Sequence, residues 1–527
     1  MFRYLKICLC VVLTLCLLLL SACANSTTTT TEEIVEIPVE GTTNSDNPSS
    51  DSTNDKPSSS DGGQNNMSNS DKPSSSNKNP VNSSSSITNV DDPNFVPDQS
   101  IGSDVVISNT VKGEEQTVFT PISLADAQKN AKKHMDSTSA TFSISNIDSV
   151  NSAIYNTDDY RLAKLIEKAL KGENLTIATL GGSITNGGGA GGAQYRYVTR
   201  IHEWFKATFP NIKVTLINAG IGATTSAFGI YRLKEDVLIY DPDLIVIDYA
   251  ANDGTRAHLT ETYEGLLRCA LNYKETAVVP IYFSNKAKAS AQKTEKTTAD
   301  HYKLPQVSYM DAFKDYSDWA NMYADGTHPN ALGHGRAAFA FNQLMTTALN
   351  NYNSAKKSYS IPEPIISSCL NYGKDTLVKL QYQNGEVSFL KNQVVNNKTE
   401  DVPLTGKITF DNKNYTLKKD NHALVHHNFD IIKVAKGKTL KFTIKDIKTF
   451  LIIMARDADQ GSNIEVVVTE NDTKKKTTTT IDCYYKKLNI WDSGALYKTS
   501  DGKPHSVTVE LTPIDADFSF AGLGISE

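Results

Sequence analysis

The sequence predicts two folded domains: a three-layer α/β/α sandwich with a five-stranded parallel sheet, followed by an all-β sandwich or jelly roll. Three observations predict this. Between residues 158 and 348, short apolar runs alternate with segments of helical periodicity, which is typical of a parallel sheet covered on both faces. After about residue 358, apolar residues recur at every second position instead. A length of 527 residues leaves room for two or three domains.

The first 23 residues are predicted to be a lipoprotein signal peptide. Arg3 and Lys6 precede an apolar run over 7–20, as in the charged and hydrophobic regions of a secretory signal. The tetrapeptide Leu-Ser-Ala-Cys that ends at Cys23 resembles the bacterial lipobox, which implies that Cys23 is acylated and becomes the new N-terminus. A cleaved signal with a chance cysteine and an uncleaved anchor are the alternatives, but the run is short for a span of about 20 residues.

Residues 24–118 are predicted to be a disordered linker. Ser, Thr, Asn and Asp dominate it, and the hexapeptide Asp-Lys-Pro-Ser-Ser-Ser at 55–60 recurs at 71–76. So few apolar groups cannot offset the entropy lost on ordering. A coil of this length has a reach of about 50 to 60 Å. It would tether the folded part, 119–355 and 356–527, far enough from a membrane to span a cell wall.

The net charge of −6 is concentrated in the linker. Residues 24–118 hold 15 acidic and 4 basic residues, whereas residues 119–527 hold 44 acidic and 47 basic ones. No basic stripe is therefore hidden behind an acidic average, and nucleic acid is not an expected partner. The predicted α/β domain has 23 residues of each sign, so its substrate should be selected by pocket shape rather than by long-range steering.

Strands and helices alternate along the α/β domain. The predicted strands are 175–180, 212–219, 244–250, 276–283 and 306–311. The predicted helices are 158–171, 194–209, 225–240, 262–273 and a last one that Asn330 caps. Because such crossovers are right-handed and the strands parallel, ligands should bind at the carboxyl ends of the strands.

Four blocks of small and polar residues stand at those strand ends. They are Gly181-Gly182-Ser183-Ile184-Thr185, Asn218-Ala219-Gly220-Ile221-Gly222-Ala223, Ala251-Asn252-Asp253-Gly254 and Asp325-Gly326-Thr327-His328-Pro329-Asn330. A serine hydroxyl needs a neighbouring base to become a nucleophile, and an imidazole suits that task, which pairs Ser183 with His328. Asp325 is close enough to hold the other ring nitrogen of His328 and to stabilise its positive charge.

The four blocks together resemble those of the SGNH hydrolases, the GDSL-type esterase superfamily, over residues 175–352. The resemblance implies a flavodoxin-like fold, Ser183, Asp325 and His328 as catalytic residues, and an oxyanion hole from the Ser183 amide, a loop amide and the Asn252 side chain. We assign the loop amide to Gly222, with Ala223 as the alternative. The sequence departs from the family at Gly182, where an Asp is usual.

Two other motifs compete with this interpretation. Gly187, Gly189 and Gly192 match the dinucleotide fingerprint, but they begin seven residues after Leu180 and no acidic residue follows the next strand to bind a ribose. The nucleophile elbow G-x-S-x-G fails because Thr185 stands at its last position. Neither motif is therefore expected to function here.

Cysteine and histidine patterns give no metal site. Cys269, Cys369 and Cys483 are too few and too widely spaced for a zinc motif, although a bridge between Cys369 and Cys483 stays open. The cluster His422, His426 and His427 lies in a β pattern, and we expect surface histidines there. No metal and no organic cofactor is expected.

The β domain is predicted from period-two segments. These include Leu440, Phe442 and Ile444, then Val507, Val509 and Leu511. Its function stays open. Tyr484, Tyr485 and Trp491 would suit polysaccharide binding if exposed, and core packing if buried.

These observations predict a cell-surface serine esterase, anchored in the bacterial membrane by lipid. By resemblance and location, its substrate is expected to be a short O-acyl ester, most plausibly acetyl on a carbohydrate, cleaved through an acyl-Ser183 intermediate. An O-acyltransferase with the same residues, or a non-catalytic lipoprotein that binds polysaccharide or cell wall, is the alternative.

Overall fold

The computed structural model describes residues 119–254, 259–354, 358–383, 386–395, 398–410, 414–424, 427–456, 463–483 and 489–527. The predicted signal peptide with Cys23 and the predicted linker lie outside the described residues, as do His426, Tyr484 and Tyr485. Within the described part, none of the helices has the length and apolar character needed to cross a bilayer.

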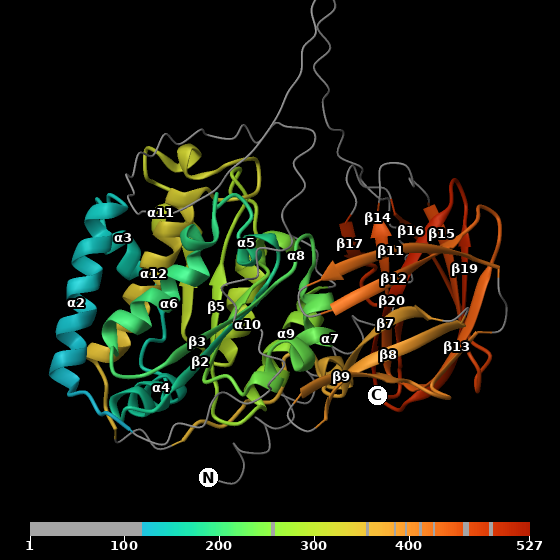
Figure 1. Ribbon diagram of the computed structural model, residues 1–527, viewed down its shortest axis with the longest axis horizontal. Helices are drawn as coiled ribbons and strands as arrows, with labels where there is room; N and C mark the ends of the chain where they lie inside the picture. Colours follow the sequence, from blue (N-terminus) through green and yellow to red (C-terminus); the bar gives the residue numbers. More distant parts are fainter. Residues whose placement is uncertain are drawn as a thin grey trace, which may run out of the picture. The chain divides into compact units, whose positions relative to one another are not determined.

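A six-stranded sheet forms the centre of the first domain (Figure 1). Its parallel strands lie in the order β3–β2–β4–β5–β6, which is 2-1-3-4-5 along the chain and therefore flavodoxin-like. Their bounds are Val214–Gly220, Leu175–Gly181, Leu244–Asp248, Ala277–Tyr282 and Gln306–Ser308. The short β1, Ile154–Tyr155, pairs antiparallel with β6 and adds an edge strand that the sequence did not predict. The predicted parallel sheet is confirmed.

Helices cover both faces of this sheet. One face packs on helices that share a single apolar cluster: α2 Leu124–Thr141, α3 Ile147–Ser152, α4 Tyr160–Leu170, α6 Tyr197–Thr208, α11 Tyr309–Phe313 and α12 Ala331–Asn350. The other face packs on α7 Ser226–Asp236, α9 Leu259–Leu271 and α10 Gln292–His301. As predicted, Asn330 caps α12, because its Oδ1 accepts hydrogen bonds from Leu332 N and Gly333 N.

The structure also differs from the predicted elements elsewhere. Helices α2 and α10 were not predicted, because α2 buries mainly small residues such as Ala127 and Ala131, and α10 is largely polar. The last strand ends at Ser308 instead of 311, because the Ser308 side chain accepts from Asp311 N and starts α11. Strand β4 ends at Asp248, and the short α8, Ala250–Asp253, follows it.

The second domain consists of antiparallel strands in two sheets. A five-stranded sheet has the order β10–β13–β19–β15–β16, and a nine-stranded sheet contains β11–β12–β20–β7–β8–β9 together with β14, β17 and β18. The bounds of the strands are β7 Asp375–Gln383, β8 Glu386–Val395, β9 Lys398–Pro403, β10 Ile408–Phe410, β11 Thr416–Leu424, β12 His427–Val434, β13 Leu440–Ile447, β14 Thr449–Arg456, β15 Asn463–Glu470, β16 Lys476–Asp482, β17 Asn489–Asp492, β18 Tyr497–Lys498, β19 His505–Pro513 and β20 Phe518–Ser526. The two sheets enclose one apolar core, which confirms the predicted all-β domain.

The nine-stranded sheet is buried on both faces around β20. Phe520 and Ile525 of this strand enter the core between the two sheets, whereas Ala521 joins the cluster that also contains Phe228 and Tyr231 of α7. Helix α7 contacts both β7 and β20, and Figure 1 shows it between the parallel sheet and these strands. The two domains therefore share a continuous apolar core.

The structure also decides the open Cys369–Cys483 bridge and the expected surface position of His427. Cys269, Cys369 and Cys483 are free thiols, so the bridge that the sequence left open is not formed. His427 is buried and not on the surface as expected, because its Nε2 bonds the Asp236 carboxylate of α7. The His427 side chain lies on the same face of β12 as Phe429 and Ile431, which faces the first domain.

Candidate active site

Three of the predicted catalytic side chains form a continuous hydrogen-bonded chain. Ser183 is the first residue of α5, Ser183–Asn186, directly after β2. Its Oγ lies 2.8 Å from His328 Nε2, and His328 Nδ1 lies 2.7 Å from Asp325 Oδ2. Both distances are those of good hydrogen bonds, and the order matches a nucleophile, a base and the residue that orients the base.

The turn that carries Asp325 and His328 is held by its own backbone. Asp325 Oδ1 accepts hydrogen bonds from Thr327 N and His328 N, each at 2.7 Å, while Ala324 N donates to His328 O at 2.9 Å. Partial burial alone would raise the pKa of Asp325, but the bonds and charge of His328 and the two backbone amides hold that pKa well below its usual range. Asp325 is therefore a carboxylate that can stabilise a positively charged imidazole.

A glycine loop packs directly on the imidazole. A Cβ on Gly188 would lie 2.7 Å from His328 Cδ2, so the backbone approaches the ring as closely as a glycine allows. The buried His334 of α12 holds this loop, because its Nε2 bonds Gly188 O at 3.0 Å and its Nδ1 accepts from Tyr197 N at 3.2 Å. Burial lowers the pKa of His334 to about 4, although the bond to Gly188 opposes that shift.

The glycines of the dinucleotide-like motif lie in and beside this loop. Gly188 and Gly189 both approach His328, and Gly187 lies against the Arg196 side chain. Of the three motif glycines, Gly189 therefore lies against the predicted base His328, and Gly187 makes room for the Arg196 side chain.

The predicted oxyanion loop after β3 lies beside the nucleophile. A Cβ on Gly222 would be 3.8 Å from the Cβ of Ser183, an ordinary contact distance. Ala223, the alternative donor, has a φ of 61°. A non-glycine residue in this region costs roughly 1 kcal/mol or more, and Ala223 is one of nine such residues in the described part of the chain. The structure thus places Gly222 beside Ser183.

Asn252 occupies the space that a side chain at position 182 would need. A Cβ on Gly182 would lie 2.4 Å from Asn252 Oδ1 and 2.8 Å from its Nδ2. The departure from the family pattern at Gly182 is thus matched by the close approach of Asn252. Gly182 does not serve a left-handed turn, because its φ is −89°.

Two buried residues that were not predicted from the sequence, Asp248 and Tyr197, hold the Thr185 side chain two residues after Ser183. Thr185 Oγ1 donates to Asp248 Oδ2 at 2.8 Å and lies 2.8 Å from the Tyr197 hydroxyl. Asn218 Nδ2 donates to Thr185 O at 3.0 Å, which joins the first two blocks. Burial raises the pKa of Asp248 to about 7, and the nearby charge of Asp253 adds to this shift.

A buried arginine of α7 joins the ends of the catalytic strands. Arg232 donates to Ala219 O at 2.6 Å, to Gly181 O at 2.9 Å and to the Tyr249 hydroxyl at 2.9 Å. Its charge is balanced by Asp236 at 3.1 Å. All three bonded residues lie two or three positions before a predicted site residue. The only signal in the sequence was a pair of opposite charges four residues apart in a predicted helix.

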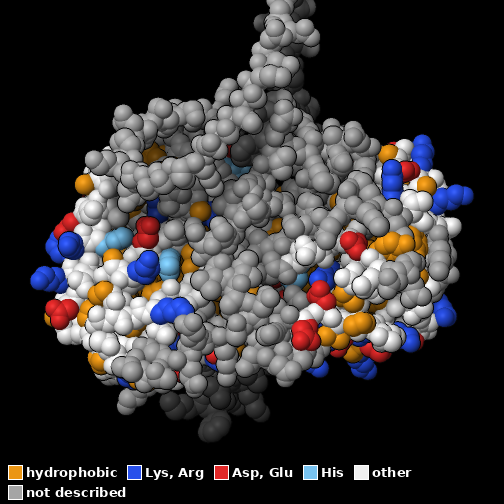
Figure 2. Space-filling view, viewed as in Figure 1, with side chains coloured by type: hydrophobic (Ala, Val, Ile, Leu, Met, Phe, Trp, Pro, Cys, Tyr) orange, Lys and Arg blue, Asp and Glu red, His pale blue; other side chains and the backbone are white. Residues whose placement is uncertain are grey.

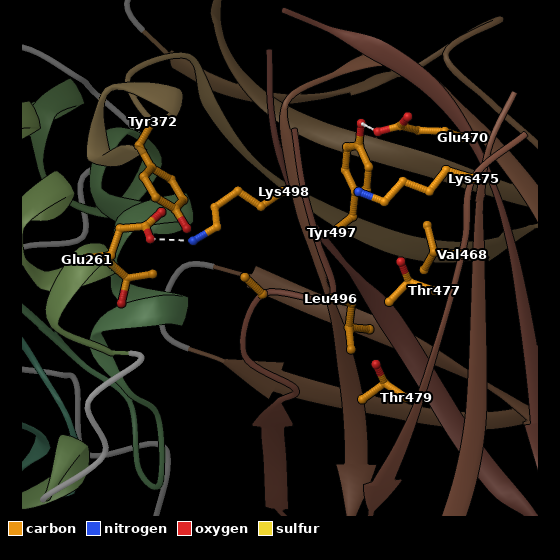
Figure 3. Close-up of a pocket in the computed structure, with 12 residues that line it drawn as sticks. Glu261, Tyr372, Val468, Glu470, Lys475, Thr477, Thr479, Leu496, Tyr497 and Lys498 are labelled. Carbon is orange, nitrogen blue, oxygen red and sulfur yellow. Dashed lines mark hydrogen bonds and ion pairs between the residues drawn. The ribbon is translucent and has the colours of Figure 1, made fainter. Parts of the chain in front are cut away.

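A separate pocket of about 400 Å³ lies between α9 and the β domain (Figure 3). Glu261 and Lys498 form an ion pair across it, and Tyr497 donates to Glu470 at 2.8 Å. None of Ser183, Asp325 and His328 lines this pocket. Among the described residues, no cluster of three or more His, Cys, Asp or Glu side chains could hold a metal ion.

The structure thus brings together all five predicted site residues, namely Ser183, Gly222, Asn252, Asp325 and His328. Their individual catalytic roles stay predictions. Cys23, the predicted lipidation site, lies outside the described residues.

Comparisons with known proteins agree with this site. The model of the GDSL-like lipase/acylhydrolase family matches residues 179–336. The crystal structure of a two-domain esterase active on acetylated mannans is similar to this chain, with 25% identity and a TM-score of 0.54 over 70% of this chain and 95% of that chain. The structure of such an esterase co-crystallized with mannopentaose matches with 25% identity and a TM-score of 0.53 over the same shares, 70% and 95%.

An acetylxylan esterase from Geobacillus stearothermophilus is similar over a smaller part, with 22% identity and a TM-score of 0.28 over 32% of this chain and 94% of that chain. No curated protein matches the chain. The family match spans all four catalytic blocks as far as Arg336, and the mannan-active esterase shares the two-domain architecture. The chain therefore carries a catalytic domain of the GDSL-like lipase/acylhydrolase family, with the SGNH fold, and it is an enzyme that hydrolyses ester bonds.

Proposed function

We propose that this protein is an acetylesterase that removes O-acetyl groups from a polysaccharide. The observation that carries the proposal is the Ser183–His328–Asp325 chain, with bonds of 2.8 and 2.7 Å beside Gly222 and Asn252. Such a chain performs acyl transfer through a covalent serine ester.

In the first half of the reaction, Ser183 Oγ attacks the acetyl carbonyl while His328 Nε2 takes its proton. Asp325 holds Nδ1 of the same ring and stabilises the charge that the ring gains. The carbonyl oxygen becomes an oxyanion, which the Ser183 amide, the loop amide at Gly222 and the Asn252 side chain would bind. Each such donor contributes about 100- to 1000-fold in rate.

The first half ends when His328 gives its proton to the sugar oxygen and the alcohol leaves, so that acetyl-Ser183 remains. In the second half, water attacks the acetyl-serine while His328 takes its proton, and the return of that proton to Ser183 Oγ releases acetate and restores the serine. The side chains of His328 and Asp325 are 26% and 42% exposed, so water can reach the base. This exposure favours hydrolysis over transfer to a second sugar.

Two further observations support a carbohydrate substrate. The mannan-active esterase is similar over 95% of its own length, including a second domain. Charge gives no preference for an ionic polymer, because the described surface in Figure 2 mixes Lys and Arg with Asp and Glu side chains. A neutral acetylated glycan fits such a surface.

The decisive experiment is acetate release from a panel of acetylated mannans, xylans and other polysaccharides by the full-length protein. We expect release from at least one polymer, and a decrease in kcat of about 10⁴-fold or more for Ser183→Ala. Cleavage of 4-nitrophenyl acetate without acetate release from any polymer would leave an esterase but remove the carbohydrate substrate. Faster transfer of acetyl to an added glycan than to water would identify an acyltransferase.

We also propose that the protein is a cell-surface lipoprotein anchored through Cys23. The sequence around Cys23 and the polar composition of 24–118 support this proposal. Replacing Cys23 with Ala should move the protein from the membrane fraction to the medium or to an uncleaved precursor. An unchanged membrane fraction with a processed N-terminus would contradict lipid anchoring.

A further inference from the structure

Helix α7 has almost no surface of its own. Every residue from Ser226 to Asp236 is buried except Lys234. A helix at the edge of an α/β domain usually keeps one polar face in water. Here the nine-stranded sheet of the β domain covers the face that would be exposed, and Tyr231 at the middle of the helix bonds Thr449 of β14 at 2.8 Å.

The N-terminal end of α7 is held by carboxylates of both domains, and Ser226 N donates to Asp253 Oδ1 of the α/β domain at 2.9 Å. Thr225, the N-cap residue, makes no side-chain cap of its own. Instead its hydroxyl lies 3.1 Å and its amide 3.4 Å from Asp492 Oδ2, at the end of β17. Asp492 is buried, and Thr225 follows the candidate oxyanion donor Gly222 by three residues.

The C-terminal end of α7 is held by a histidine of the β domain. His427 Nε2 lies 2.5 Å from Asp236 Oδ1, and both side chains are nearly inaccessible, with exposures of 2% and 0%. The other oxygen of Asp236 bonds Arg232, which donates to the carbonyls of Gly181 and Ala219. These carbonyls belong to the ends of β2 and β3, directly before the nucleophile and the oxyanion loop.

We propose that Asp492 and His427 are positioning residues, through which the β domain holds the oxyanion side of the active site in its productive geometry. Asp492 fixes the start of α7 and with it the loop over 222–225. His427 fixes Asp236, which orients Arg232 against the ends of the two strands.

The physical basis is the sensitivity of an oxyanion hole to small displacements. Its donors must be about 2.7 to 3.1 Å from the oxyanion, and a shift of about 1 Å can lower the rate by about 100-fold. Such a loss appears in kcat, because the oxyanion exists only in the transition state and intermediate. The inference rests on ester hydrolysis at Ser183, but not on the identity of the sugar.

The test compares Asp492→Ala with Tyr231→Phe in the full-length protein. Both substitutions remove a hydrogen bond between α7 and the β domain, but the Tyr231 hydroxyl bonds Thr449 at the middle of the helix and not the loop over 222–225 or Asp236. For Asp492→Ala we expect kcat on 4-nitrophenyl acetate to fall by about 10- to 100-fold at an unchanged KM. Tyr231→Phe should retain the kcat of the parent even if its Tm falls equally.

Milder substitutions test the proposal even if an alanine variant fails to fold. Asp492→Asn keeps one acceptor oxygen and should recover most of the lost kcat, and Thr225→Val removes only the hydroxyl bond and should show a smaller decrease. His427→Gln, which keeps a donor, should likewise be faster than His427→Ala. Hydrogen exchange of the segment 218–228 should increase in Asp492→Ala but not in Tyr231→Phe.

The proposal is wrong if Asp492→Ala keeps the parent kcat, or if kcat falls equally in Tyr231→Phe. It is also wrong if the folded Thr225→Val enzyme matches the parent in kcat and in exchange. Failure of the carbohydrate proposal looks different, because the parent would then cleave 4-nitrophenyl acetate but release no acetate from polysaccharides.

Discussion

The two sides of the active site are built in contrasting ways. The proton-transfer side consists of one turn, where Asp325, His328 and their backbone partners lie within four residues, with a glycine loop against the ring. The oxyanion side draws on three strand ends, a buried arginine and two residues of the β domain. The chemistry of proton transfer is thus local in sequence, whereas the geometry that stabilises the oxyanion depends on the whole molecule.

Removing the base His328 should give the largest decrease in kcat, because proton transfer on this side of the site depends on it. His328→Ala deletes the acceptor 2.8 Å from Ser183 Oγ, so kcat on 4-nitrophenyl acetate should fall by about 10⁴-fold or more. The Ser183→Ala/His328→Ala double variant should be no slower than either single one, because the residues act as a unit. His301→Ala is a matched control on α10, and it should retain the parent rate. If the fold-loss of kcat in the double variant equals the product of the two single losses, Ser183 and His328 do not act as one catalytic unit.

On the oxyanion side, removing the Asn252 side chain should lower kcat less than removing His328 does, but more than the substitutions beside Asn252 described below. Asn252→Ala should lower kcat by about 100- to 1000-fold with little change in KM. Asn252→Asp keeps the shape of the side chain but cannot donate a hydrogen bond. It should therefore be about as slow as the alanine variant, and a rate near that of the parent would remove Asn252 from the oxyanion hole.

Adding one methyl group to a glycine should lower kcat on the oxyanion side of the site but not on the proton-transfer side. In Gly182→Ala, the added Cβ would overlap Asn252, which must move, and we expect kcat to fall by about 10- to 100-fold. Gly326→Ala is the control on the proton-transfer side, because a Cβ there meets nothing within 4 Å. Steady-state kinetics of the two purified variants check this contrast, and equal rates would show that Gly182 is not needed for the position of Asn252.

The smallest effect concerns stability in acid. The pKa of His334 is lowered to about 4 in the fold, below the ordinary 6.5, so between these values the unfolded chain binds more protons. The free energy of unfolding should therefore decrease as the pH falls from 6.5 to 4, by at most about 1.4 kcal/mol per pH unit from this group. Urea unfolding at pH 7 and pH 4.5 should show a smaller decrease for His334→Gln. An equal decrease in both proteins would exclude His334 as the cause.

The local side of the site could be predicted from sequence, because its signals are local too. Apolar runs marked the strands, and the blocks at their ends paired Ser183 with His328 and Asp325, which the structure brings together, whereas Asn252 followed from the resemblance. Gly222 followed from the resemblance, and the structure places it beside Ser183. Even the early end of β6 had a local signal, since Ser308 stands three residues before Asp311.

The supporting contacts could not be predicted in the same way. Asp492 lies 267 residues from Thr225, and His427 lies 191 residues from Asp236. Periodicity describes which face of a strand or helix is apolar but not which other face covers it. His427 therefore looked like a surface residue of a β strand, although it is buried against another domain.

The position of β20 affects when the enzyme can become active. This strand pairs with β7, β12 and β14, so it lies at the centre of the sheet that covers α7, yet it follows every other described element along the chain. A nascent chain can contain Ser183, His328 and Asp325 long before residues 518–526 are synthesised. Activity should therefore appear only after these residues emerge, and chains stopped before residue 518 should be inactive. Such a delay would keep the esterase inactive until β20 has joined the sheet.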